Sequence, residues 1–248
     1  MFSTGQHWML YSTAPLAGLS FLFQALKLKK PATATLGLII IFLGLYLTGR
    51  GFLGGLFFLN PLFEGPFFVP FCLAILSFSL TYKESPAALP VIGGTLAALL
   101  FACFYAKGII PPTPNKLTIW AVLFFLTENS AHACFISGGL GALVWSENKP
   151  DSDIFHRFLI WGFVLYSMSQ IIGAWWAYIG WGNTFSWGPR HMSSAFLWLI
   201  YAAYIHLRFV QGWSMKRQAA WAIVSALILI ITVYGHHLHE MTFTRVGG

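Results

Sequence analysis

Charged side chains are scarce in this chain. Of its 248 residues only 8% are Asp, Glu, Lys or Arg, whereas 57% are hydrophobic. A typical soluble domain carries about 25% charged residues, so this sequence lacks the polar surface that a water-soluble fold requires. The composition excludes a soluble globular protein and predicts an integral membrane protein that lies largely in the lipid bilayer.

Motifs that would indicate other classes of protein are also missing. The three cysteines form neither CxxC nor CxxCH, so the chain has no c-type haem attachment sequence of its own. Small core positions are their expected role. Period-two alternation of polar and apolar residues is absent, which disfavours a membrane β-barrel. The first 20 residues contain no Lys or Arg, so a cleavable signal peptide is not expected.

What remains is a series of eight apolar segments, each about long enough to cross a bilayer as a helix. Helices are required because lipid offers the backbone no hydrogen-bond partners. Prolines lie at many of the segment ends, where they are tolerated. We therefore predict an all-α polytopic membrane bundle of about eight transmembrane helices, forming a single domain over 1–248. The expected spans are about 8–26, 32–49, 66–82, 87–106, 117–145, 155–178, 193–212 and 219–238.

The distribution of Lys and Arg predicts how the bundle lies in the membrane, because cytoplasmic loops carry the excess of basic residues. One set of loops holds nine: Lys27, Lys29, Lys30, Lys83, Lys149, Arg157, Arg208, Lys216 and Arg217. The other set holds five: Arg50, Lys107, Lys116, Arg190 and Arg245. The first set is expected on the inner side of a cytoplasmic membrane, with both termini and the Trp-rich segment outside. These loop charges explain the net charge of +7, and no nucleic-acid partner is expected.

The densest aromatic stretch is residues 175–187. It contains Trp175, Trp176, Tyr178, Trp181, Phe185 and Trp187, and a segment broken by Gly and Asn follows the first Trp pair. Trp and Tyr concentrate at membrane interfaces, so an interfacial belt is one interpretation. The clustering beside histidines favours a second, a flat aromatic shelf that suits a flat ligand such as haem. Arg190 follows directly, and its guanidinium is suited to pairing with a haem propionate.

His132 is the histidine that lies deepest in an apolar segment. It precedes Trp145 by 13 residues, which places it about 20 Å from the predicted cytoplasmic end of its helix. Glu128 lies four residues earlier on the same helix face, where a carboxylate can hold the second ring nitrogen of a metal-ligating imidazole. Ionisable groups at such depth are costly and usually functional. A hydrogen bond between helices is the alternative.

Most of the other histidines lie near segment ends. His206 lies a few residues from the predicted cytoplasmic end, where it either marks an inner haem position or sits at the interface beside Arg208. His7 and His156 are expected to be interfacial and inert. A cluster of three ends the last span on the outside: His236, His237 and His239. Its members are candidate iron ligands, or a solvated cluster that binds stray metal.

Many of these residues form a pattern that resembles the cytochrome c assembly family, of the CcsA, ResC and CcmC type, over about residues 115–248. The family's external loop reads roughly WGxYWSWDPKETW and leads into a helix that ends in YLHxR. Here Trp181 to Trp187 matches the first part of the loop, and His132 fits a histidine that begins a motif ahead of it. Other residues match in register: Pro189, Trp198, Tyr204, His206 and Arg208.

The resemblance implies a cofactor, a partner and a function. Members of the family handle haem through the Trp-rich loop. It implies that b-type haem is held at the outer face against Trp181 and Trp187 and presented to the CxxCH thiols of apocytochrome c. It further implies His132 as one axial ligand, a histidine of 236–239 as the other, and an inner haem position at His206.

Departures from the family pattern concentrate in the loop. The Asp after the last loop Trp is Gly188 here, and the family's external haem-ligating His falls near Thr244 or Arg245. The Lys-Glu-Thr-Trp run is replaced by Arg190, His191, Met192 and Ser193. An alternative therefore stays open: a family-derived membrane subunit of a respiratory or electron-transfer complex that binds a b-type haem or serves as a scaffold. A transporter is disfavoured because paired buried carboxylates are lacking.

Overall fold

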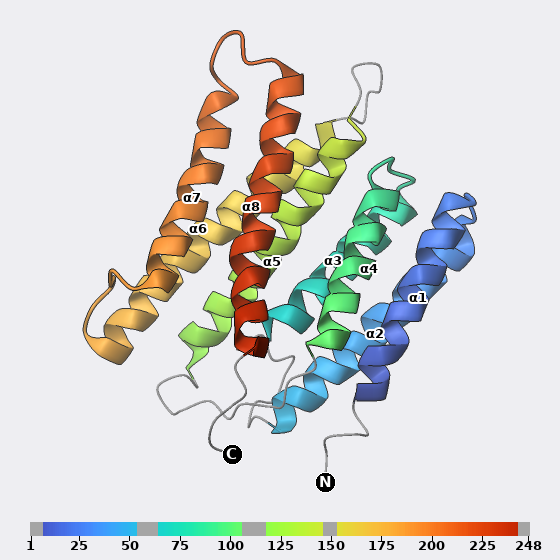
Figure 1. The fold of residues 1–248 in the computed structure, drawn as a ribbon, viewed down its shortest axis with the longest axis horizontal. Coiled ribbons are helices and arrows are strands. Elements are labelled where there is room, and N and C mark those ends of the chain that lie inside the picture. Colours follow the sequence, from blue (N-terminus) through green and yellow to red (C-terminus); the bar gives the residue numbers. More distant parts are fainter. Residues whose placement is uncertain (1–6, 54–63, 106–117, 146–152, 243–248) are drawn as a thin grey trace.

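The computed structural model describes residues 7–53, 64–105, 118–145 and 153–242, and of 236–242 only the helical backbone. Within these ranges the chain forms eight α-helices and no strand (Figure 1). They are α1 (His7–Ala25), α2 (Lys29–Leu53), α3 (Gly65–Tyr82), α4 (Ala88–Phe104), α5 (Ile119–Leu143), α6 (Ile154–Trp181), α7 (Pro189–Leu207) and α8 (Met215–Thr242).

These helices coincide with the eight predicted segments, and the all-α polytopic class is confirmed. Five are long and apolar enough to cross a membrane: α2, α3, α5, α6 and the Met215–Gly235 part of α8. The apolar helix α4 is shorter, at 17 residues. Every predicted end lies within five residues of the observed one, because the length of an apolar run fixes where a membrane helix begins and ends.

Successive helices run in opposite directions, so their connections gather at two ends of the bundle (Figure 1). The start of α1, the end of α8 and the turn between α6 and α7 lie at one end, which we call the Trp end. The turns that join α1 to α2, α3 to α4 and α7 to α8 lie at the other, the basic end. The start of α1, the end of α8 and the Trp-rich segment thus share one end, and the side of the membrane that it faces stays a prediction.

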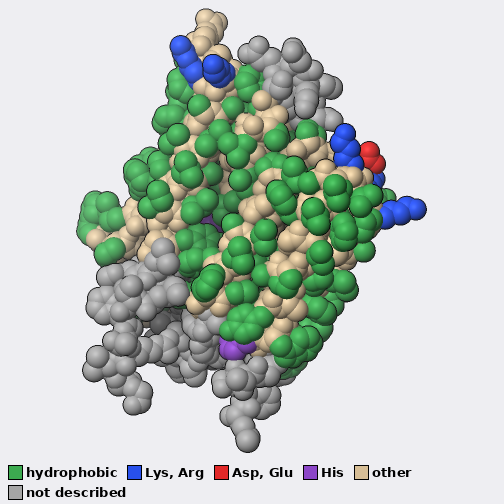
Figure 2. All heavy atoms as spheres, turned by 45° about the vertical axis from the view of Figure 1, so that its right-hand side comes forward, with side chains coloured by type: hydrophobic (Ala, Val, Ile, Leu, Met, Phe, Trp, Pro, Cys, Tyr) green, Lys and Arg blue, Asp and Glu red, His purple; other side chains and the backbone are tan. Residues whose placement is uncertain are grey.

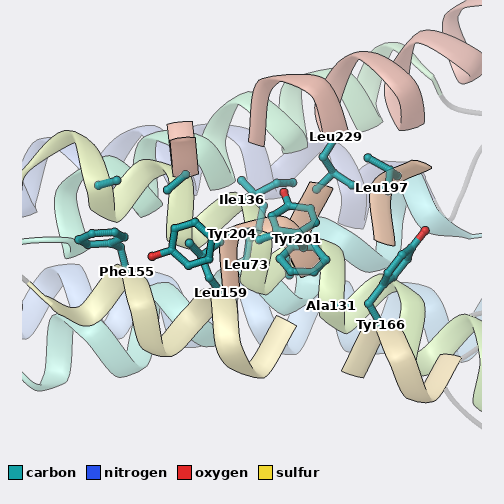
Figure 3. Close-up of a cluster of buried hydrophobic side chains, with 14 of the residues drawn as sticks. Leu73, Ala131, Ile136, Phe155, Leu159, Tyr166, Leu197, Tyr201, Tyr204 and Leu229 are labelled. Atoms are coloured by element: carbon teal, nitrogen blue, oxygen red, sulfur yellow. The ribbon is translucent and has the colours of Figure 1, made fainter. Parts of the chain in front are cut away.

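The described residues form two large apolar cores and two smaller clusters. Helices α1 to α4 enclose one, with Leu36, Leu43 and Leu99 fully buried. Helices α5 to α8 enclose the other (Figure 3), in which Phe135 of α5 stacks on Tyr201 of α7 with ring centroids 3.4 Å apart. Leu73 of α3 also belongs to this second core, so α3 connects the two halves.

Among the described helices, α5 and α6 share the most extensive contact. A Cβ on Gly162 of α6 would lie 2.6 Å from the Phe135 ring, so only glycine allows this approach. Small residues at such contacts are the usual means by which membrane helices associate. This packing places His132 of α5 against Tyr166 of α6, with ring centroids 5.7 Å apart.

Arg50 is a buried residue, and its assignment to an outer loop was wrong. It lies in the last turn of α2 with 2% of its surface exposed, and Glu64, just before α3, is 3% exposed. The Arg50 Nε and Nη2 atoms donate to the two Glu64 carboxylate oxygens, each at 2.9 Å. A bidentate carboxylate allows a guanidinium to stay buried, which is why hydropathy alone placed Arg50 outside the helix.

Candidate functional site

The Trp-rich segment is more helical than predicted. Helix α6 continues through Trp181 and ends at Gly182, whose φ of 73° is left-handed and favours glycine. Most of the aromatic residues therefore project from the last turns of a helix, and residues 182–188 form the turn that follows. The sequence contains no proline between Pro150 and Pro189, so no proline stops α6 earlier.

The aromatic side chains of this segment divide into a buried and an exposed group. Trp176 is buried against Phe124 and Phe125 of α5, with ring centroids 5.9 and 6.1 Å away. The two tryptophans predicted to face haem, Trp181 and Trp187, are 55% and 83% exposed. Their rings are open to a ligand or to the membrane interface, so the shelf and belt interpretations both fit this geometry.

Arg190 starts α7 and reaches across to α5. Its Nη2 lies 3.8 Å from Glu128 Oε2, and its guanidinium carbon lies 5.5 and 5.1 Å from the ring centres of Phe124 and Phe125. The Arg190 side chain is 55% exposed, whereas that of Glu128 is 12% exposed. Arg190, which the sequence predicts to pair with a haem propionate, thus already faces the Glu128 carboxylate. This single contact is long, and more than half of the Arg190 side chain stays accessible.

His132 lies one helical turn beyond Glu128 and is buried between helices. Its ring packs against Tyr166, and the Tyr166 hydroxyl donates to the Ser194 carbonyl of α7 at 3.3 Å. Glu128, His132 and Arg190 are therefore brought together by α5, α6 and the start of α7. His132 can therefore ligate a haem only from between these helices.

His206 lies at the opposite, basic end and is exposed on α7. Its Nδ1 lies 2.8 Å from the Ala202 carbonyl oxygen. Because a carbonyl only accepts, Nδ1 carries the proton, and the Nε2 lone pair is left for another partner. A backbone carbonyl on the second nitrogen is the usual orientation of a metal-ligating imidazole.

The three histidines near the end of α8 can be assessed only in part. His236, His237 and His239 continue the α8 helix at the Trp end, and their side chains lie outside the described residues. Thr244 and Arg245 lie outside them altogether. Among the described side chains, no group of three or more His, Cys, Asp or Glu is placed to hold a metal ion.

His156 is the clearest residue whose role the sequence does not reveal, since it is buried and hydrogen-bonded within the bundle rather than inert. It is 2% exposed. Its Nδ1 hydrogen-bonds the Tyr204 hydroxyl of α7, and its Nε2 lies 3.4 Å from the Met215 sulfur of α8. These partners lie 48 and 59 residues further along the chain, so no local pattern in the sequence could have found them. His7 is also engaged, with Nδ1 3.4 Å from the Tyr46 hydroxyl.

The Trp-rich segment and Arg190 lie within the part of the chain that matches a known protein family. Residues 144–242 match the sequence profile of a family described as "Cytochrome C assembly protein". A relative named "Cytochrome c biogenesis protein CcsA", from Prochlorococcus marinus strain MIT 9515, is 28% identical over 243 residues, which cover 80% of this chain and 78% of the relative. The chain belongs to the cytochrome c assembly family. The profile includes the aromatic end of α6, Arg190 and all of α7, and it begins after His132.

Two other members with the same name match at higher identity over shorter stretches. The protein of Prochlorococcus marinus strain MIT 9313 is 32% identical over 193 residues, 67% of this chain and 59% of that relative. The protein of Synechococcus sp. strain CC9902 is 33% identical over 99 residues, 40% of this chain and 33% of that relative. The aligned part therefore spans from about a third to about four fifths of these cytochrome c assembly proteins.

Proposed function

We propose that this chain is a membrane protein of cytochrome c biogenesis that holds haem at the Trp end, on the outer face of the membrane, and delivers it to apocytochrome c. The observation that carries the proposal is that exposed Trp181 and Trp187 and the accessible guanidinium of Arg190 lie at the same end of the bundle, inside the stretch that matches the family. Aromatic faces suit a porphyrin, and a guanidinium suits its propionates.

The donor set fits haem as cargo. Neutral imidazoles would coordinate the iron of a bound haem. The histidines available for this are His132, near the middle of α5, and His206 at the basic end. The Nε2 of His206 is left for a partner by its Nδ1 bond to Ala202. His237 and His239 are proposed as the second iron ligands, and their side chains lie outside the described residues.

Arg190 has a defined task in this proposal. It exchanges the long contact with Glu128 for a closer pair with a propionate. The 3.8 Å separation is beyond hydrogen-bonding distance, so a carboxylate that bonds the exposed guanidinium directly competes well. Release of Glu128 leaves an acid beside His132, where it is able to orient the imidazole.

A membrane subunit of an electron-transfer complex is the second candidate. Two observations favour it: the loop lacks the family's acids at Gly188 and His191, and His206 presents its imidazole from the exposed surface of α7, where a second subunit can reach it. His191 is also engaged within the turn, since its Nδ1 lies 2.7 Å from the Ser186 hydroxyl. Stable stoichiometric co-purification with other subunits would favour this candidate.

Complementation distinguishes the two candidates, because a subunit of an electron-transfer complex is expected to restore no holocytochrome c. In a cell that lacks its own system but supplies the family's usual partner subunit, we expect the wild-type chain to restore holocytochrome c poorly, about tenfold below a relative with an intact loop, because removing a loop acid weakens positioning of the reactants. Gly188→Asp with His191→Glu is expected to raise the yield. Haem-stained gels measure it. Full restoration by the wild-type chain would show that the loop acids are dispensable.

Topology is tested by labelling with a membrane-impermeant maleimide. Asn183→Cys at the Trp end is expected to react from outside intact cells, and Ser214→Cys at the basic end only after lysis. The loops of the basic end hold nine Lys and Arg against four at the Trp end, once the buried Arg50 is set aside, and this excess marks the basic end as cytoplasmic. The parent chain, whose three cysteines all lie in helices and are partly or fully buried, gives the background. The reverse pattern would invert the proposed orientation.

A further inference from the structure

A groove lies between α2 and α3 at the basic end, in the half of the bundle that the proposed haem site does not use. Its volume is about 510 Å³. The lining comprises Lys29, Lys30, Thr33, Ala34 and Gly37 of α2 with Phe78 and Tyr82 of α3. The α2 residues recur at helical spacing on one face, so they form a continuous wall rather than a scattered patch.

The groove is basic at its mouth and apolar below it. Lys29 Nζ lies 2.7 Å from Glu84 Oε1 and 5.4 Å from the centre of the Tyr82 ring. Lys30 makes no ion pair with any residue that the structure describes. From Lys29 to Gly37 the groove follows α2 for about 12 Å, and its floor there is the Phe78 ring, 3.9 Å from where a Gly37 Cβ would lie.

We propose that this groove binds an anionic glycerophospholipid, with its phosphate at Lys29 and Lys30 and one acyl chain along Gly37 and Phe78. Basic pockets between membrane helices bind anionic head groups in this way. The order of groups also follows the bilayer, since the lysines lie at the end of α2 and the apolar wall lies within the span. Figure 2 shows basic side chains at this edge, above a surface that is otherwise largely hydrophobic.

Charge complementarity favours an anionic lipid over a neutral one or a protein helix. The described basic residues of the basic end are Lys27, Lys29, Lys30, Lys83, Arg157, Arg208, Lys216 and Arg217, against the two acids Glu84 and Asp153. The hydrogen bond that Lys29 donates to Glu84 lowers the pKa of the Glu84 carboxyl. Because the Glu84 side chain is 72% exposed, the pair is solvated and a phosphate is able to share Lys29. An uncharged head group gains nothing from this excess, and a 12 Å groove is short for a helix.

Native mass spectrometry of the purified full-length chain tests the head group. With phosphatidylglycerol added, we expect the wild type to retain one lipid, and the double variant Lys29→Gln with Lys30→Gln to bind it roughly tenfold more weakly, because each lysine near the surface contributes to attraction of an anionic head group. Lys216→Gln with Arg217→Gln removes two charges at the same end, away from the groove, and is expected to bind as the wild type does. Equal losses in both double variants would contradict a specific site.

The acyl chain is tested separately by Gly37→Phe, which keeps both lysines. The Gly37 Cβ position has only Phe78 nearby, so the ring is expected to fill the groove without disturbing the core and to reduce lipid retention about as much as loss of the lysines. Unchanged retention in this variant would reduce the site to a head-group contact and contradict the groove. Equal retention of phosphatidylcholine by the wild type would contradict the anionic specificity.

Discussion

Replacing His132 with alanine is expected to lower the haem content of the purified chain at least about tenfold. Under the proposed function His132 is an axial ligand, and even residues that merely support a ligand contribute about 10- to 100-fold to metal affinity. The substitution also leaves a cavity beside Tyr166, 5.7 Å from the lost ring. The haem content is measured by the pyridine haemochrome, and the ligand change by the reduced-minus-oxidised spectrum.

The control for this experiment is His7→Ala. His7 starts α1 at the Trp end, and its Nδ1 is 3.4 Å from the Tyr46 hydroxyl of α2, in the half of the bundle that does not contain His132. It has no part in the proposed site, so its removal is expected to leave the haem content and spectrum unchanged. Unchanged haem in the His132 variant would remove this residue from the site, and equal losses in both variants would point to damaged folding rather than to a lost ligand.

The second large effect is expected at the Arg50–Glu64 pair. Glu64→Gln leaves a guanidinium buried without its countercharge, and breaking a buried ion pair in this way costs about 3–5 kcal/mol. In a chain of this size each kcal/mol shifts the melting temperature by about 2–4 °C. We therefore expect the detergent-solubilised variant to melt at least about 6 °C below the wild type, measured by intrinsic tryptophan fluorescence on heating.

Glu84→Gln is the matched control, because it removes the carboxylate of an ion pair with a similar separation, 2.7 Å to Lys29, in an exposed position. Exposed pairs contribute little, since water and salt screen them. A small change in melting temperature is therefore expected at Glu84. If the two variants melted alike, burial of Arg50 and Glu64 would not be the source of the stability.

The sequence predicts the helices well and the polar contacts between them poorly. Apolar run length and proline positions are local properties, and they located all eight helices. The extent of α6 was underestimated because Trp, Gly and Asn after Trp176 resemble a loop, although the helix continues to Gly182. The position of Glu128 and His132 on one face of α5 followed from their i, i+4 spacing, which is also a local property.

The contacts that were missed join residues from different helices. His156 was expected at the interface because it lies near the start of its span, yet Tyr204 and Met215 enclose it. Arg50 was counted with the loops because hydropathy treats every arginine as unpaired. The contact between Arg190 and Glu128 depends on how α7 lies against α5. The sequence predicted a haem propionate, and not a protein carboxylate, as the partner of Arg190.

The buried Arg50–Glu64 pair also bears on how the protein enters the membrane during synthesis. An arginine within a membrane segment costs about 3 kcal/mol to insert at the helix centre, and less near an end. Glu64, which offsets that cost, follows Arg50 by 14 residues and leaves the ribosome only after α2 is complete. Helices α2 and α3 are therefore expected to insert together as a hairpin. A chain that stopped after α2 would hold Arg50 in lipid without the Glu64 carboxylate that pairs with it.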